Sequence, residues 1–104
     1  MERIDAMAQL GAHLRAAKDE YLDAVIARTE FNNGWLTKDN QKQSIAAIAT
    51  HFLTKDALTD WANQYDIQDD VDQKTVGLIL AGNIPLVGFH DMLCVFISGH
   101  RSMV

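Results

Sequence analysis

An asparagine stands at the point of the chain where a reaction is most readily placed. Asn83 follows a short apolar run, residues 75–81, and precedes Pro85, so it lies where a strand would end and a helix begin. Open α/β sheets bind ligands at such positions, and helix N-termini present N–H groups to anions. A side-chain amide there can donate a hydrogen bond to a developing oxyanion without titrating. On the residues alone we favour an asparagine selected for a turn, although the spacing does not decide between the two interpretations.

A second candidate is the pair His90 and Cys94, which are four residues apart in the segment that should form the following helix. On one helix face such a pair could act as nucleophile and base. A reactive thiol needs an electropositive, accessible setting, whereas this segment is apolar apart from Asp91. We therefore favour a buried cysteine and a core histidine.

The sequence gives no support for a metal site or for the common nucleotide-binding motifs. The chain has one Cys and four scattered His, without the paired spacing of a zinc site. Residues 66–72 contain four acids, but the glycine and closing Glu of an EF-hand are absent, so we predict a solvated acidic linker. There is no G-x-G-x-x-G and no P-loop. His100 and Arg101 could contact a phosphate, although basic residues at a helix C-terminus explain them as well.

Charge divides the chain into two regions. Residues 1–74 contain 8 of the 9 Lys and Arg and 13 of the 14 Asp and Glu, and residues 75–104 contain only Asp91 and Arg101. We predict a helical region over 1–74 and an α/β region over 75–104. The acidic balance, a net charge of −5, argues against a nucleic-acid partner. Residues 76–97 are long and apolar enough to suggest a membrane span, but the turn signal at 82–85 and Asp91 interrupt them, so we expect no span.

The second region has the pattern of a strand, a helix and the beginning of another strand. We predict a strand over about 75–82 that is buried on both faces, a helix that starts at Pro85 and runs to Ser98, and a second extended segment from Arg101. Gly99 should end the helix. Such a βαβ unit pairs its strands in parallel. Because so small a parallel sheet would lack partners, we expect a fragment whose remaining sheet lies beyond Val104.

The first region should consist of amphipathic helices. Apolar residues at three-to-four spacing predict one long helix over 4–25, which should end before Asn33-Gly34. The tetrapeptide Leu-Thr-Lys-Asp occurs at 36–39 and again at 53–56, and each copy offers a Thr N-cap followed by an acid in the first turn. At the second copy, Leu53 and Leu58 are placed to form a hydrophobic staple.

Residues 76–86 and 97–104 together resemble one protein family. The segment Val-Gly-Leu-Ile-Leu-Ala-Gly-Asn-Ile-Pro-Leu, followed later by Ile-Ser-Gly-His-Arg-Ser-Met-Val, is similar to the beginning of the cofactor domain of the fatty acyl-CoA reductases of bacterial bioluminescence. That family belongs to the aldehyde dehydrogenase superfamily, whose Pro-Trp-Asn-x-Pro motif matches here at Asn-x-Pro, with Ala81 and Gly82 in place of Pro-Trp. The resemblance covers only residues 75–104, and it implies an α/β fold for the parent protein.

The resemblance also implies a reaction and its residues. Asn83 would help to form an oxyanion hole, and the backbone of Leu80, Ala81 and Gly82 would border the nicotinamide of NADPH. The parent would be a cytoplasmic enzyme that reduces an acyl-CoA or another acyl thioester to an aldehyde through an acyl group bound to a Cys. In the family that Cys comes well after this motif, so the role does not pass to Cys94, and the 104 residues alone would be inactive and bind no NADPH.

Two other interpretations remain open. In the first, the chain is a non-catalytic helical binding module that forms a homo-oligomer through its apolar C-terminal segment, and Asn83 is a turn residue. In the second, it is a small membrane-associated protein.

Overall fold

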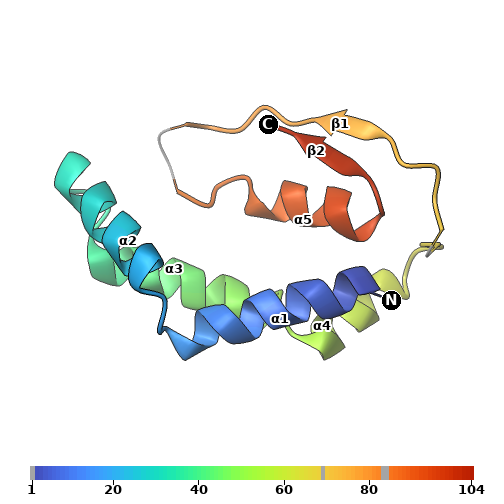
Figure 1. Cartoon of the computed structure of the whole chain (residues 1–104), viewed down its shortest axis with the longest axis horizontal. Helices are drawn as coiled ribbons and strands as arrows, with labels where there is room; N and C mark the ends of the chain where they lie inside the picture. Colours follow the sequence, from blue (N-terminus) through green and yellow to red (C-terminus); the bar gives the residue numbers. More distant parts are fainter. Residues whose placement is uncertain (1, 69, 83–84) are drawn as a thin grey trace.

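Helices make up most of the part of the chain that the structure describes. The computed structural model describes residues 2–68, 70–82 and 85–104. The elements follow in the order α1 (Glu2–Ala16), α2 (Glu20–Asn32), α3 (Lys38–His51), α4 (Lys55–Ala62), β1 (Thr75–Gly77), α5 (Phe89–Ile97) and β2 (Arg101–Met103). In Figure 1, α5 lies between the pair of strands and the layer that contains α1, α3 and α4. A mostly helical chain with one small strand pair agrees with the predicted class of this segment.

The two Leu-Thr-Lys-Asp copies begin helices as predicted. Thr37 Oγ1 accepts a hydrogen bond from the Asn40 N–H at 3.1 Å, and Thr54 Oγ1 accepts one from the Ala57 N–H at 3.2 Å. Each threonine therefore satisfies one of the N–H groups that a helix start leaves without a partner.

The long helix predicted over residues 4–25 is wrong, because the chain turns between α1 and α2. Ala17 has a left-handed φ of 54°, and Asp19 caps α2 by accepting a hydrogen bond from the Leu22 N–H at 3.1 Å. His13 on α1 contacts the other Asp19 oxygen at 2.9 Å. Hydrogen bonds from His13 and from the Leu22 N–H hold the pKa of the Asp19 carboxyl below its usual value. The apolar spacing continues across this break, so it could not reveal the turn.

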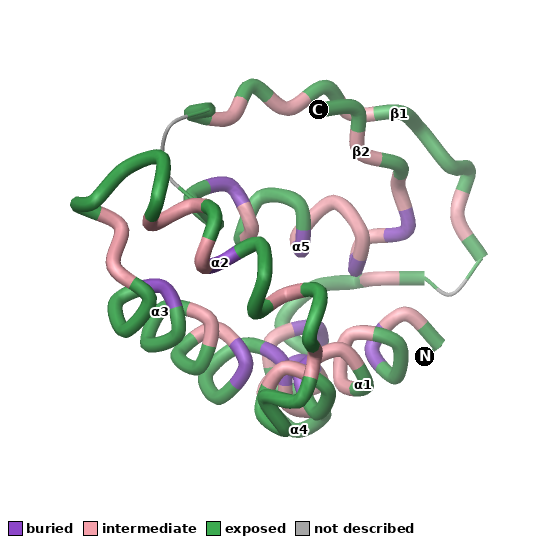
Figure 2. The backbone as a smooth tube through the Cα atoms, turned by 60° about the vertical axis from the view of Figure 1, so that its left-hand side comes forward, coloured by how far each residue is buried: buried purple, intermediate pink, exposed green. Residues whose placement is uncertain are grey.

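One hydrophobic core joins the two predicted regions. Its buried members come from both sides of residue 74 and are Ile4, Leu53, Leu58, Ala62, Leu93 and Ile97. Figure 2 shows buried stretches of backbone, in purple, on α1, α4 and α5. Leu53 and Leu58, the two residues predicted to form a staple, both belong to this core. The α5 segment is therefore packed on the helices rather than standing apart from them.

Gly11 allows α1 to approach the junction between α3 and α4 closely. A Cβ at Gly11 would overlap the carbonyl oxygen of Leu53, which is backbone and cannot rotate away. Replacing glycine by alanine inside a helix ordinarily stabilises it by about 1 kcal/mol. We expect the opposite sign for Gly11→Ala, a loss of about 1–3 kcal/mol in the free energy of unfolding, because the new methyl group forces the helices apart.

Urea denaturation of Gly11→Ala checks this expectation. Gly34→Ala is the matched control, because a Cβ at Gly34 meets no atom within 4 Å. A Gly11→Ala protein as stable as the wild type would contradict the close contact.

The strands β1 and β2 pair in parallel, as predicted. Thr75 lies opposite Arg101, Val76 opposite Ser102, and Gly77 opposite Met103. Gly99, with a φ of 92°, ends α5 as predicted. The Gly99 N–H donates to Phe96 O and the His100 N–H to Val95 O, both at 3.0 Å, which is the Schellman pattern.

Two boundaries in this region differ from the prediction. The strand predicted over about 75–82 covers only Thr75–Gly77, and it is largely exposed rather than buried on both faces. The described pairing of β1 with β2 ends where the Leu78 N–H donates to Met103 O at 2.8 Å. The helix predicted to start at Pro85 starts at Phe89 instead, because Leu86 has a φ of 65°, outside the helical region.

The apolar stretch 76–97 is thus divided among β1, a connecting segment and α5. No helix among the residues that the structure describes is both long and apolar enough to cross a membrane.

Candidate functional site

The predicted site residues lie in the segment that connects β1 to α5. Asn83, the predicted oxyanion donor, lies outside the described residues. Leu80, Ala81 and Gly82 are described, and the first two line a shallow groove of about 260 Å³ at the N-terminal end of α5. The other lining residues are Leu86, Val87, Gly88, Phe89 and Met92.

This groove is built by a close contact between Leu80 and Gly88. The Leu80 methyl groups occupy the space that a Cβ at position 88 would take, so the glycine lets the segment before Asn83 lie directly against the start of α5. All lining residues are apolar or glycine. The volume of the groove is below that of most small-molecule sites, and its described lining contains no charged or hydrogen-bonding side chain.

His90 and Cys94 do come together on one face of α5. Cys94 Sγ lies 3.7 Å from His90 Nδ1. The predicted core histidine is wrong, because His90 is exposed, and its ring contacts Phe52 and Trp61 at centroid distances of 5.8 Å and 6.2 Å. Cys94 is partly buried. His90 thus contacts two aromatic rings and still remains exposed to solvent, although its neighbours in the sequence are apolar.

The surroundings of Cys94 oppose its use as a nucleophile. Burial raises the pKa of the Cys94 thiol above its usual value, and the negative charge of Asp91 raises it further. The thiolate is the reactive form, so this cysteine is less reactive near neutral pH than a free one. Both effects therefore disfavour the thiolate form of Cys94.

Alkylation of Cys94 as a function of pH tests this pKa direction. Cys94 is the only cysteine of the sequence, so iodoacetamide reports on it alone. We expect the pH midpoint of the alkylation rate to lie above that of the same chain in denaturant. Asp91→Asn should lower this midpoint because it removes a negative charge that disfavours the thiolate. Equal midpoints in the folded and denatured chain would contradict the assigned cause.

His100 and Arg101 follow α5 and are engaged with the preceding linker. His100 Nδ1 accepts a hydrogen bond from the Lys74 N–H at 3.1 Å, and Arg101 Nη2 donates to Gln73 Oε1 at 3.1 Å. Sequence reasoning missed Arg3, whose Nε donates to Ile97 O at 3.0 Å and whose Nη2 donates to Gln68 O at 2.7 Å. Its position off the apolar stripe of the first helix gives no signal of this tertiary role.

Within residues 2–68, 70–82 and 85–104, no three His, Cys, Asp or Glu side chains gather as a metal site would require. Comparison with protein-family models, curated proteins and solved structures found no match to this chain.

Proposed function

We propose that this chain is the N-terminal part of a cytoplasmic, NADPH-dependent acyl-CoA reductase that converts a fatty acyl thioester to an aldehyde. The proposal rests on the resemblance of residues 76–86 and 97–104, and one structural observation supports it. The pair β1 and β2 is a parallel sheet of two strands with no element on its outer face among the described residues (Figure 1). Parallel sheets are almost always larger and covered on both faces, so further strands of a parent α/β domain would complete this one.

Asn83 is the chemical centre of the proposal. It belongs to the segment that leaves β1, and its amide would donate a hydrogen bond to the substrate oxygen. Thioester reduction passes through two tetrahedral stages, one when the acyl group is transferred to the enzyme and one when it is reduced. A neutral amide stabilises the oxyanion at both stages without exchanging a proton.

The cofactor would lie against the segment that precedes Asn83. NADPH supplies the hydride when it is bound. The apolar groove beside Leu80 and Ala81 would receive one face of its nicotinamide ring and exclude water there. The phosphates and riboses need groups from outside this sequence, so the 104 residues alone should not bind the cofactor.

The nucleophile of the proposed reaction is a cysteine outside this sequence. Its thiolate attacks the thioester carbonyl, the bond from that carbon to the CoA sulfur breaks, and CoA leaves as the thiol. The raised pKa of Cys94 supports placing this step elsewhere.

The activity is tested on the protein encoded by the complete reading frame that contains this sequence. We expect NADPH oxidation that depends on added myristoyl-CoA and yields the aldehyde and free CoA in equal amounts. NADPH oxidation that yields no aldehyde would contradict the proposal. So would the absence of NADPH oxidation when a folded protein is offered acyl-CoA of several chain lengths.

The exposed apolar residues at the sheet favour a second candidate, a non-catalytic module that self-associates through its C-terminal segment. Ile79, Met103 and Val104 are all exposed. For this candidate, light scattering of the isolated chain should give a defined oligomer that Ile79→Lys dissociates. A monomer at high concentration would exclude it.

A further inference from the structure

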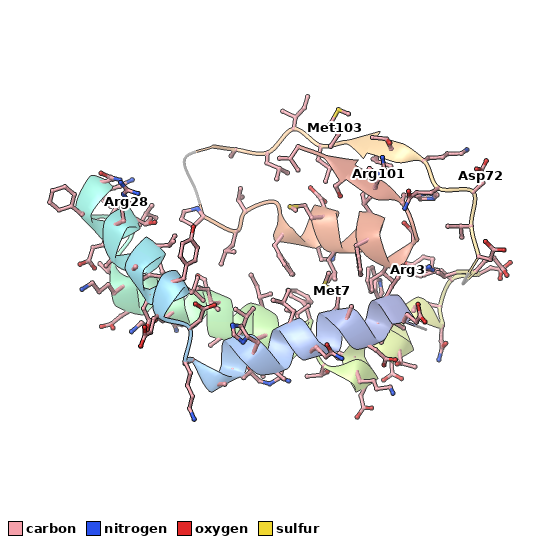
Figure 3. The ribbon with its side chains drawn as sticks, viewed as in Figure 1. Arg3, Met7, Arg28, Asp72, Arg101 and Met103 are labelled. Carbon is pink, nitrogen blue, oxygen red and sulfur yellow. The ribbon has the colours of Figure 1, made fainter. Side chains whose placement is uncertain are left out.

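A second cavity lies along α5 and shares only the lining residues Phe89 and Met92 with the groove beside Leu80. It has a volume of about 530 Å³, within the range of small-molecule sites, and it is bounded by α1, α5 and the start of β2. Its apolar walls are formed by Met7 and Leu10 of α1 and by Phe89, Met92, Leu93 and Phe96 of α5. Figure 3 shows Met7 on the side of α1 that faces α5.

The cavity has an apolar body and one polar end. The α5 residues that line it recur along the helix from Phe89 to Phe96, a rise of about 10 Å. Gly99, His100, Arg101 and Ser102 then follow at the C-terminal end of α5, where Gln73 joins them. The Arg3 contact with Ile97 O places the start of α1 at the same end. The apolar walls thus extend from this polar end toward the N-terminus of α5.

The polar end carries donors and positive charge. Because His100 Nδ1 accepts from the Lys74 N–H, the neutral imidazole carries its proton on Nε2, which can donate. The Arg101 guanidinium is held by Gln73 and matches the geometry of a carboxylate. None of the lining residues that the structure describes is Asp or Glu, although the chain as a whole has a net charge of −5.

The helix dipole of α5 does not cancel the attraction of this polar end for an anion. A helix C-terminus repels anions through its carbonyl groups. Here the carbonyls of Val95 and Phe96 accept the His100 and Gly99 N–H groups, and that of Ile97 accepts the Arg3 side chain. The last carbonyls of α5 are therefore already hydrogen-bonded.

We propose that this cavity binds an amphipathic carboxylate, with its apolar chain between α1 and α5 and its carboxylate at Arg101 and His100. The ligand is distinct from the proposed thioester substrate. Its head group lies at the C-terminal end of α5, whereas the groove beside Leu80 and Ala81 lies at the N-terminal end. The inference does not depend on the reductase reaction, because it needs neither Asn83 nor NADPH.

Calorimetric titration of the 104-residue chain with dodecanoate tests the site. We expect saturable binding of one dodecanoate per chain, and weaker binding of dodecanol, which has the same apolar chain without the charge. Arg101→Gln should weaken dodecanoate binding about tenfold and leave dodecanol binding unchanged, because it removes a charge-assisted hydrogen bond. Arg28→Gln is the matched control, since Arg28 lies on α2 at the opposite end of the molecule (Figure 3).

A second pair of variants tests the apolar body of the cavity. Met7→Trp should fill the cavity and weaken the binding of both dodecanoate and dodecanol. Met103→Trp changes an exposed residue of β2 and should leave both affinities unchanged. Should Met7→Trp fail to fold, as judged by its thermal transition, the arginine pair still decides the question. Absence of saturable heat, equal affinity for acid and alcohol, or equal losses in Arg101→Gln and Arg28→Gln would overturn the proposal. Reductase activity in the parent protein has no bearing on these outcomes.

Discussion

Replacing Asn83 by alanine in the complete protein should lower the rate of acyl-CoA-dependent NADPH oxidation about 10²- to 10³-fold. The amide is proposed to act on the oxyanion, which forms during the reaction and is absent from the ground state. Its loss should therefore reduce kcat and kcat/KM together and leave KM nearly unchanged. Steady-state kinetics with myristoyl-CoA measures this effect.

Two further variants separate the amide's chemistry from a structural role in the turn. Asn83→Asp keeps the shape and the turn preference but places a carboxylate beside the developing oxyanion, so its loss of rate should equal or exceed that of alanine. Asn32→Ala changes an asparagine at the end of α2 and should have no effect on the rate. Near wild-type turnover in Asn83→Asp would show that Asn83 is only a turn residue.

Leu53→Ala should destabilise the fold by about 2–5 kcal/mol. Leu53 is 0% exposed, and it lies between α3 and α4. Its backbone also meets α1, since the close approach at Gly11 is to Leu53 and Arg15 Nη1 donates to Leu53 O at 3.4 Å. Truncation leaves a cavity where three helices meet. A small domain has only about 5–15 kcal/mol of stability in total.

Urea denaturation followed by circular dichroism measures this loss. The control is Ile79→Ala, which removes a large apolar side chain that is fully exposed and should change the free energy of unfolding by less than about 0.5 kcal/mol. A Leu53→Ala protein no less stable than Ile79→Ala would mean that the core is not organised around this residue.

The local signals of the sequence predicted local structure well. Thr37 and Thr54 cap the helices that they were expected to cap, and Gly99 adopts the positive φ that ends α5. Each of these outcomes is set by the residue itself and its next few neighbours. The parallel pairing of β1 and β2 was also predictable, because a strand, a helix and a strand in succession favour it.

The boundaries that failed depend on distant contacts. The turn at Ala17 interrupts an apolar stripe that continues on both sides, and Asp19 was not recognised as a cap. The length of β1 depends on its pairing with β2, which lies more than twenty residues further along the chain. α5 starts late because Leu86 adopts a positive φ, which no helix signal in the sequence indicates.

Leu80 and Ala81 line one apolar groove, and their role beside a cofactor stays a prediction. His90 was expected in the core and is exposed instead, because neighbouring apolar residues do not reveal which face of a helix is covered. Arg3 and the cavity between α1 and α5 join residues far apart in the chain, so spacing along the sequence could not reveal them.

Trapping the acyl-enzyme most directly tests the claim that this chain belongs to an acyl thioester reductase. The complete protein is incubated with myristoyl-CoA in the absence of NADPH, and the acylated peptide is located by mass spectrometry. We predict one thioester-linked myristoyl group on a cysteine outside the 104 residues, still formed in Cys94→Ser and discharged when NADPH is added. No acyl adduct, or an adduct on Cys94 alone, would contradict the account.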